Sequence, residues 1–506
     1  QEKSILRKAK ELVLAIKLES VESKEQILEN YLNTAYFGRG AYGIQAAART
    51  YFGLDVSQLS ISQGAALAAL LQAPSATEKI ENREKWINRF NYVLNGMVDI
   101  NAISKDQKDS ITFPESITYS SQNKFGGTNG YLLYAIRQEM LDKGYTEDDL
   151  NLRGLKVIST FEENAQTAIV DAVTNEAPTT KTEGLRIGIA SVRPGTGEVV
   201  AMYGGPDYVT EPLNNATQAI AQAGSTFKPF ALAAAFEQGI ALDTIWNGNS
   251  PRTFGDYTLN NYSKKSFGDI TLLQATENSV NTVYVDVAFQ IGKEKVFDAT
   301  LRAGIPEDAA GMVNDITLVL GTASPHVIDV ANAYATFAAR GIYAKPTMIK
   351  EIYGANDGLL YQISPETKRA FTTQIADEVS FALSQVIQNG TGKRAKAIGR
   401  PAAGKTGTTD GNKSAWFAGY TPQLATAVMM VKQNEKGDPI SLAGTGGLKS
   451  VTGGSFPALM WTYFMKEALK DLPKLDFPPP PGVLPINTAP PIINPEDETI
   501  PEIIVA

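Results

Sequence analysis

A serine–lysine pair at a predicted helix start is the first feature of the sequence that could do chemistry. The stretch "AQAGSTFKPF" places Ser225 three residues before Lys228, and two phenylalanines flank the lysine. Side chains three residues apart lie on one face of a helix, so the amine could take a proton from the hydroxyl. A free lysine has a pKa of about 10.4, so it could act as a base near neutral pH only if burial or a neighbouring cation lowered that pKa.

Two further motifs follow this pair along the chain. They comprise Ser279 and Asn281 in "TENSVNTVY", then Lys405, Thr406, Gly407 and Thr408 in "AAGKTGTTDG". A second serine–lysine pair, Ser121 and Lys124, lies in a polar stretch without apolar support, and we interpret it as coincidental. The order Ser-x-x-Lys, Ser-x-Asn, Lys-Thr-Gly is shared by penicillin-binding proteins and class A β-lactamases, and it predicts acyl transfer through a serine ester.

The composition excludes several other kinds of site. The 506 residues include no cysteine and one histidine, His326, so thiolate nucleophiles, disulfides and Cys/His zinc sites are ruled out, and we expect no metal or cofactor. His326 stands at a predicted helix start, where we expect a capping or surface role and not a Ser-His-Asp triad. A net charge of −8 without a long basic run argues against nucleic-acid binding.

Composition and periodicity divide the chain into four parts. Residues 1–95 have helical patterns throughout, and 96–185 have a weaker pattern that indicates a small linker module. From 186 to 470, strands and helices are mixed, beginning with a hairpin around "PGTG". Residues 471–506 are Pro-rich and acidic, and we expect an extended, largely disordered tail.

Within 186–470, the pattern favours an antiparallel sheet covered by helices over an alternation of parallel strands and helices. Two strands joined through "YTP" are one sign of that arrangement. We predict strands at 346–353, 402–409, 414–420 and 424–432, and helices at 226–238, 270–291, 325–340, 373–388 and 455–470.

The segments around the motifs resemble the class A penicillin-binding proteins, bifunctional peptidoglycan synthases with a glycosyltransferase domain followed by a transpeptidase domain. "NNATQAIAQAGSTFKPF", "DITLLQATENSVNTVYV" and "SAWFAGYTP" are similar to the transpeptidase domain, and "SKEQILENYLNTAYFGRGAYGIQAAARTYFG" is similar to the second half of the glycosyltransferase domain. The resemblance covers residues 5–465. It implies a multidomain α+β protein: an all-α remnant of a lysozyme-like domain, then a β-lactamase-like, five-stranded antiparallel sheet covered by helices.

The resemblance also implies catalytic roles for the motif residues. Ser225 would attack the carbonyl of a D-Ala-D-Ala stem peptide, and Lys228 would take its proton. Ser279 would relay protons toward the leaving amine, while Asn281 would bind the substrate amide. The charge of Lys405 would help to keep the base neutral.

The same resemblance implies a substrate-binding strand. Thr406 and Thr408 would bind the substrate carboxylate, and Gly407 would keep the strand edge open. The N–H groups of Ser225 and Thr408 would form an oxyanion hole. An amine from a second stem peptide would then resolve the acyl-enzyme, and β-lactams would acylate the same serine.

The glycosyltransferase part starts after the position of the family's first catalytic glutamate, and Glu11 in "RKAKE" corresponds to the second. Because the chain starts with Gln1 within a predicted helix, we expect that an N-terminal portion with a membrane anchor has been removed. We therefore expect no glycosyl transfer by this chain, whereas the full-length parent would act on lipid II. It would work on the cell-wall side of the bacterial membrane, where wall-assembly proteins are candidate partners.

Other interpretations are a β-lactamase, a D,D-carboxypeptidase and a wall-binding scaffold or β-lactam sensor without turnover. A β-lactamase would need a deacylating glutamate between Ser-x-Asn and Lys-Thr-Gly, whereas "EPLN" at 211–214 precedes Ser225. A carboxypeptidase would differ only in using water as the acceptor. Two departures from the family pattern are Ser414, where Asp is common, and "AQAG", where Pro-Gly usually precedes the nucleophile.

Overall fold

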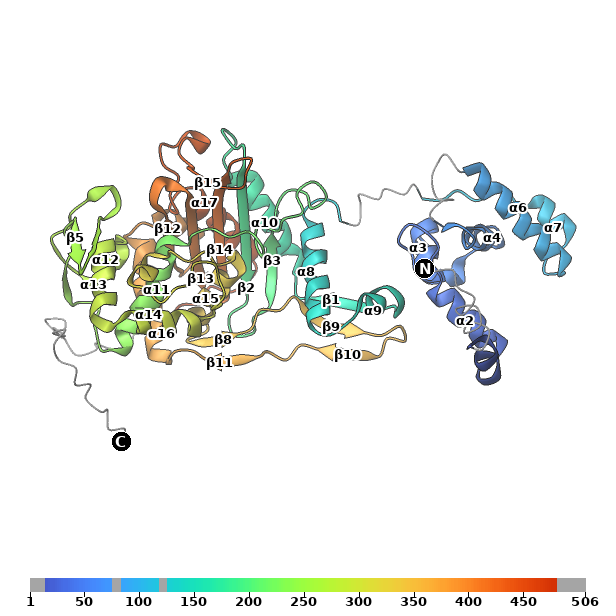
Figure 1. The fold of residues 1–506 in the computed structure, drawn as a ribbon, viewed down its shortest axis with the longest axis horizontal. Coiled ribbons are helices and arrows are strands. Elements are labelled where there is room, and N and C mark those ends of the chain that lie inside the picture. Colours follow the sequence, from blue (N-terminus) through green and yellow to red (C-terminus); the bar gives the residue numbers. More distant parts are fainter. Residues whose placement is uncertain (1–13, 75–82, 118–124, 480–506) are drawn as a thin grey trace. The chain divides into compact units, whose positions relative to one another are not determined.

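The computed structural model describes residues 14–74, 83–117 and 125–479 (Figure 1). Glu11 and the Ser121–Lys124 pair lie outside the described residues. The chain folds as two compact units. Of the described residues, the first unit contains those up to 117 with 141–156 and 353–358, and the second contains 125–140, 157–352 and 359–479.

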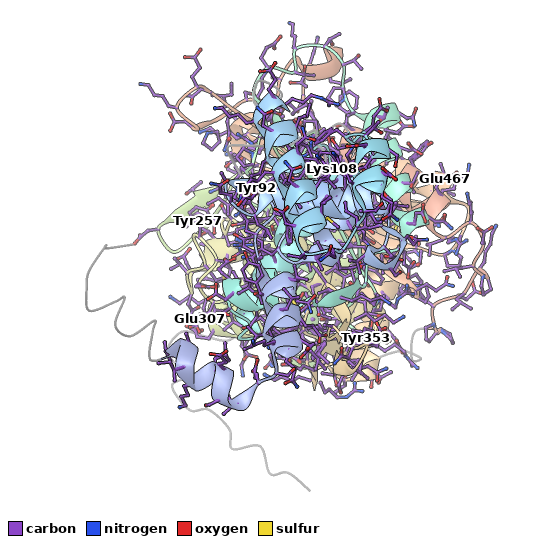
Figure 2. The ribbon with its side chains drawn as sticks, turned by 90° about the vertical axis from the view of Figure 1, so that its right-hand side faces the viewer. Tyr92, Lys108, Tyr257, Glu307, Tyr353 and Glu467 are labelled. Atoms are coloured by element: carbon purple, nitrogen blue, oxygen red, sulfur yellow. The ribbon has the colours of Figure 1, made fainter. Side chains whose placement is uncertain are left out.

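The first unit is built from helices, and its described residues up to 95 form several helices joined by short turns, in agreement with the helical patterns of the sequence. Serine side chains cap three of the helices by accepting the N–H of a glutamine three residues later. Apolar faces meet in a core around Tyr51, Trp86 and Phe90, while Tyr92 lies on an exposed helix face (Figure 2). The helices are α2 (Lys24–Thr34), α3 (Ile44–Phe52), α4 (Ile61–Leu70), α6 (Arg83–Asp99), α7 (Lys105–Ser110) and α9 (Glu147–Leu152).

An antiparallel sheet forms the centre of the second unit. Its five main strands lie in the order β12, β13, β14, β2, β3, and a short sixth strand, β15, pairs with β14. The predicted five-stranded antiparallel sheet is therefore confirmed, with one short strand added. The strands are β2 (Leu185–Val192), β3 (Val199–Tyr203), β12 (Ala403–Thr408), β13 (Ser414–Thr421), β14 (Leu424–Gln433) and β15 (Pro439–Ile440).

Helices cover both faces of this sheet because its strands carry apolar side chains on both sides. In β13, Trp416 and Tyr420 belong to the core shared with α11, α15 and α16, whereas Phe417 belongs to the core shared with α10 and α17. The period of two along the strand places these neighbours on opposite faces. The helices are α10 (Glu163–Glu176), α11 (Lys228–Glu237), α15 (Val327–Ala338), α16 (Thr373–Gln388) and α17 (Phe456–Ala468).

The segment 96–185 differs from the single linker module that we expected. Its described residues divide between the two units. Within it, α10 buries Ala165, Ile169 and Ala172, whose spacing of four and three residues forms an apolar face, in one core with strands of the sheet. We propose that the sheet domain includes α10 and so begins before residue 163.

The prediction of one helix over 270–291 is wrong. Two shorter helices, α12 (Leu272–Glu277) and α13 (Asn281–Ile291), are separated by a turn in which Ser279 has a φ of 57°. A right-handed helix requires negative φ, so the helix must end before this residue and restart after it. The break places Ser279 in a turn between two helices instead of on a helix face.

The remaining elements lie outside the central sheet and the helices that cover it. The C-terminal residues after α17 carry no helix or strand up to 479, although the ring of Phe477 packs edge-on against Tyr420 at 5.7 Å. In the described ranges, no helix is both long and apolar enough to cross a membrane. These elements are α8 (Asn129–Asp142), β1 (Lys156–Ser159), β4 (Ile245–Asn247), β5 (Arg252–Phe254), β6 (Tyr257–Leu259), β7 (Asp269–Thr271), α14 (Lys293–Ala303), β8 (Ile342–Ala344), β9 (Ile349–Tyr353), β10 (Leu359–Gln362) and β11 (Thr367–Arg369).

Candidate active site

Ser225 lies where an irregular segment turns into α11. A 3-10 turn, η3 (Gly224–Phe227), precedes the helix, and Pro229 occupies its first turn, where a backbone N–H has no helical partner. The N–H of Gly224 donates to the carbonyl of Gly321 at 3.0 Å. The half-buried Ser225 is thus held on a tethered turn.

Lys228 is fully buried and is held by the Ser-x-Asn motif. Its Nζ donates to the carbonyl of Ser279 at 2.7 Å, to its Oγ at 3.2 Å, and to Oδ1 of Asn281 at 2.7 Å. Burial, together with the charge of Lys405, holds the pKa of Lys228 well below its ordinary value. The neutral form that this lowered pKa favours has two N–H donors and one lone pair, so it keeps two of the three hydrogen bonds. Its lone pair can then accept a proton, as the proposed base must.

Ser279 connects the two lysines. Its Oγ accepts a hydrogen bond from Nζ of Lys405 at 2.7 Å as well as the one from Lys228. Lys405 is also fully buried, and burial lowers its pKa to about 7. The turn between α12 and α13 therefore presents one hydroxyl to two amines whose protonation states influence each other.

The Lys-Thr-Gly motif lies on β12, an edge strand that pairs with β13 alone. Oγ1 of Thr406 lies 2.7 Å from Oγ1 of Thr391. A Cβ on Gly407 would lie 2.4 Å from the carbonyl oxygen of Ala223, so only glycine lets the strand approach the turn that carries Ser225. The third motif thereby lies directly against the first.

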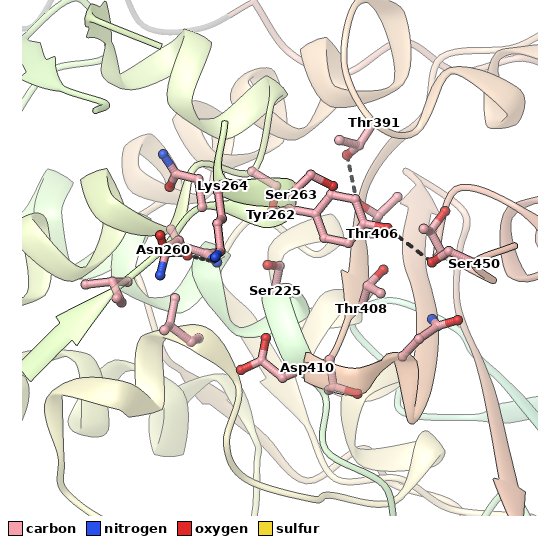
Figure 3. Close-up of a pocket in the computed structure, with 18 of the residues that line it drawn as sticks. Ser225, Asn260, Tyr262, Ser263, Lys264, Thr391, Thr406, Thr408, Asp410 and Ser450 are labelled. Carbon is pink, nitrogen blue, oxygen red and sulfur yellow. Dashed lines mark hydrogen bonds between the residues drawn. The ribbon is translucent and has the colours of Figure 1, made fainter. Parts of the chain in front are cut away.

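A cavity of about 880 Å³ brings the three motifs together (Figure 3). The two lysines are buried outside its lining, next to the side chains that reach it. Among the described residues, the Ser225 hydroxyl has no hydrogen-bond partner and is exposed to this cavity. The motif residues that line the cavity are Ser225, Ser279, Asn281, Thr406 and Thr408.

Several polar residues that complete the cavity were missed by the sequence analysis. Ser450 lies in "AGTGGLKSVTGGSF", whose glycines and hydroxyl residues are typical of a loop, and Asp410 follows the Lys-Thr-Gly strand directly. No local pattern distinguishes Asn260 or Tyr262 from other loop residues. Tertiary contacts alone bring these residues to the cavity.

The two departures from the family pattern lie in contact with each other. Ser414 is buried, and its Oγ donates to the carbonyl of Gln222, in "AQAG", at 2.6 Å. The indole N–H of Trp416 donates to the same carbonyl at 2.9 Å. Ser414 therefore helps to hold the segment that leads into Ser225.

The histidine that a Ser-His-Asp triad would use and the glutamate that a β-lactamase would use do not line this cavity. His326 occupies the N-cap position of α15, at the helix start where the sequence places it, and its backbone N–H donates to the carboxylate of Asp329 at 3.0 Å. Neither His326 nor Glu211 of "EPLN" lines the cavity. Among the described lining residues, the one carboxylate is that of Asp410.

Replacing Gly321 by alanine should destabilise the second unit and displace the turn that carries Ser225. Gly321 has a φ of 73°, and a Cβ there would lie 1.9 Å from the carbonyl oxygen of Gly224. The unfavourable φ and the clash together should lower the free energy of unfolding by about 3 kcal/mol. Gly239→Ala is the matched control, because its φ is 78° with nothing within 4 Å of the added Cβ. Equal losses of stability in urea unfolding would contradict the role of the contact.

Comparisons with known proteins match both units. A transglycosylase family model matches residues 1–98, and a model of the penicillin binding protein transpeptidase domain matches residues 187–450. Penicillin-binding protein 1A of Mycolicibacterium smegmatis is 34% identical over 507 residues, which cover 94% of this chain and 62% of that protein. Penicillin-binding protein 2D of Bacillus subtilis is 30% identical, covering 95% of this chain and 70% of that protein.

Solved structures agree with this match. The PonA1 protein of Mycobacterium tuberculosis, in complex with penicillin V, is 30% identical with a TM-score of 0.64, covering 72% of this chain and 99% of that one. Penicillin-binding protein 1A of Haemophilus influenzae shares the fold at a TM-score of 0.74 and 23% identity, covering 91% and 88% of the two chains. The chain spans about three fifths of the length of the first curated relatives. The three motifs at one cavity and the two matched domains show that the chain belongs to the class A penicillin-binding proteins.

Proposed function

We propose that this chain is a D,D-transpeptidase that cross-links peptidoglycan stem peptides through an acyl-enzyme on Ser225. The observation that supports this most strongly is the hydrogen-bonded set of Lys228, Ser279 and Lys405 beside a free hydroxyl in a cavity. The solved relative in complex with penicillin V supports acylation of the same serine by β-lactams in this chain.

Acylation begins when Oγ of Ser225 bonds to the carbonyl carbon of the penultimate D-alanine while its proton passes to the neutral amine of Lys228. The peptide C–N bond then breaks, and the terminal D-alanine leaves with a proton relayed through Ser279. An amine of a second stem peptide attacks the ester, loses its proton to the lysine, and returns the serine to its hydroxyl form. The Ser225–Lys228 hydrogen bond that this requires forms when substrate binds, since such contacts are often loose in free enzymes.

The edge strand β12 supplies the binding surface in this proposal. An extended peptide can pair with a free strand edge, which would align the D-Ala-D-Ala end beside Ser225. The hydroxyls of Thr406 and Thr408 line the cavity and would bind the substrate carboxylate, while the N–H groups of Ser225 and Thr408 stabilise the oxyanion. Asn281, whose Nδ2 donates to the carbonyl of Asn260 at 3.1 Å, would bind the stem amide from a fixed position.

The transglycosylase match over residues 1–98 supports lipid II as a substrate of the whole protein. Membership of the class A family supports a location on the cell-wall side of the bacterial cytoplasmic membrane, with a membrane anchor and wall-assembly partners.

Reaction with glycan strands that carry pentapeptide stems tests the transpeptidase proposal. We expect both D-alanine release and cross-linked dimers, which chromatography with mass spectrometry resolves. D-Alanine release without dimers would replace the proposal by a D,D-carboxypeptidase. A penicillin adduct without D-alanine release would indicate a sensor, and no adduct at all would indicate an inert scaffold.

A further inference from the structure

A side-chain contact crosses the lining of the cavity next to Ser225. The hydroxyl of Tyr262 lies 3.1 Å from Oγ of Ser450, and the two residues are 188 positions apart in the chain (Figure 3). Tyr262 begins η4 (Tyr262–Lys264), the turn after β6, and Ser450 lies in the loop between η8 (Thr445–Gly447) and α17. The contact therefore joins two loops that line the same cavity.

The loop that carries Tyr262 is held by the hydrogen bonds of its neighbour Asn261. Asn261 is buried, and its amide nitrogen donates to the carbonyls of Gly248 at 2.9 Å and Lys265 at 3.0 Å. Its side-chain oxygen accepts from the N–H of Thr282 at 3.0 Å and from its Oγ1 at 3.1 Å, so all of its main polar contacts are made. The Tyr262 side chain, by contrast, is 60% exposed and can rotate without loss of core packing.

The loop that carries Ser450 is hydrogen-bonded to the proposed substrate-binding strand β12 and to the turn that follows this strand. Val451 exchanges two hydrogen bonds with the side chain of Asn412, its N–H donating to Oδ1 at 2.9 Å and its carbonyl accepting from Nδ2 at 2.5 Å. The N–H of Gly453 donates to Oγ1 of Thr408 at 3.2 Å. We call the contact between Tyr262 and Ser450 the bridge. The loops at both ends of the bridge are thus held by residues next to the motifs, and the bridge itself is the contact that breaks most easily.

We propose that Tyr262 and Ser450 form a gate at the nucleophile and that this gate determines which acyl donors reach Ser225 quickly. The inference rests on the proposed transpeptidase function. The bridge ties together two loops that line the cavity, so a donor that carries a large group across these loops must break it, whereas a narrow donor need not. Opening requires the loss of one exposed hydrogen bond and rotation of one side chain. The bridge therefore slows bulky acyl donors more than small ones.

The test compares the second-order rate constants with which two β-lactams acylate the full chain. One is benzylpenicillin, and the other is a penicillin whose side chain carries a large fluorophore. Tyr262→Phe and Ser450→Ala each remove one end of the bridge, and each should raise the rate constant for the bulky penicillin about 2- to 10-fold, the change expected for one hydrogen bond. The rate constant for benzylpenicillin should change less than about 2-fold.

The double variant Tyr262→Phe/Ser450→Ala should behave like either single variant, because both substitutions break the same contact. Tyr463→Phe is the matched control: its hydroxyl accepts a hydrogen bond from Asn175 at 3.2 Å outside the cavity lining, so neither rate should change. Thermal unfolding verifies that every variant folds.

Unchanged rates in both single variants, or additive effects in the double variant, would overturn the gate. An equal decrease of the acylation rate constants for both penicillins would also overturn the gate, because it would show that Tyr262 and Ser450 help to bind every donor instead of excluding bulky ones. Failure of the proposed function is distinguishable, because the reaction with pentapeptide glycan strands tests it separately from these acylation rates. Absence of an adduct with either penicillin in the wild-type chain would contradict acylation of Ser225 itself.

Discussion

Replacement of Ser225 by alanine should abolish the covalent adduct that the wild-type chain forms with a β-lactam. In the proposed mechanism the Ser225 oxygen forms the ester, so its removal leaves no route to the acyl-enzyme, and noncovalent binding adds no mass. Because the side chain is half-buried in a cavity and makes no hydrogen bond to described residues, the substitution should leave stability nearly unchanged.

Intact-protein mass spectrometry after exposure to benzylpenicillin measures this result, and peptide mapping locates the modified residue. Ser441→Ala is a suitable control, since Ser441 is exposed and lies outside the cavity lining. An adduct on the Ser225→Ala chain, for example at Ser279, would show that the nucleophile has been assigned to the wrong serine.

Replacement of Lys228 by methionine should lower the acylation rate about 1,000-fold while the chain remains folded. A general base contributes roughly 10²- to 10⁴-fold, and methionine fills a similar buried volume without an amine. The loss of three hydrogen bonds from Nζ is offset by the removal of a buried ionisable group. A rate within about 3-fold of wild type would contradict the role of Lys228 as the base.

The pH dependence of acylation separates this chemical role from a packing role. The neutral amine is the reactive form, so the wild-type rate should rise with pH through the lowered pKa of Lys228 and level off above it. Since the charge of Lys405 contributes to that lowering, Lys405→Met should raise the pKa of Lys228 and shift the rise to higher pH. In Lys228→Met the residual rate should lose this rise, and a profile like that of wild type would exclude Lys228 as the titrating base.

Local sequence patterns were sufficient for much of the fold. The predicted helix 373–388 is observed over the same residues, and β13 and β14 begin where predicted, because each element carries the apolar period of its own type. Patterns failed at 270–291, where apolar residues continue through the break, since a single positive φ at Ser279 leaves no trace in hydrophobic periodicity. They also failed at α10, whose apolar face fits any partner and does not reveal that this partner is the sheet.

The sequence by itself predicted the chemistry, because three motifs follow one another in the order that is typical of a serine–lysine acyl-transfer centre. These motifs contain Ser225 and Lys228, then Ser279 and Asn281, then Lys405. Only the tertiary structure decided how that centre is assembled. The break before α13 lets one Ser279 hydroxyl meet both buried amines, and the Tyr262–Ser450 bridge joins loops 188 residues apart. Such contacts depend on turn geometry and on pairing across the whole chain, neither of which a local pattern encodes.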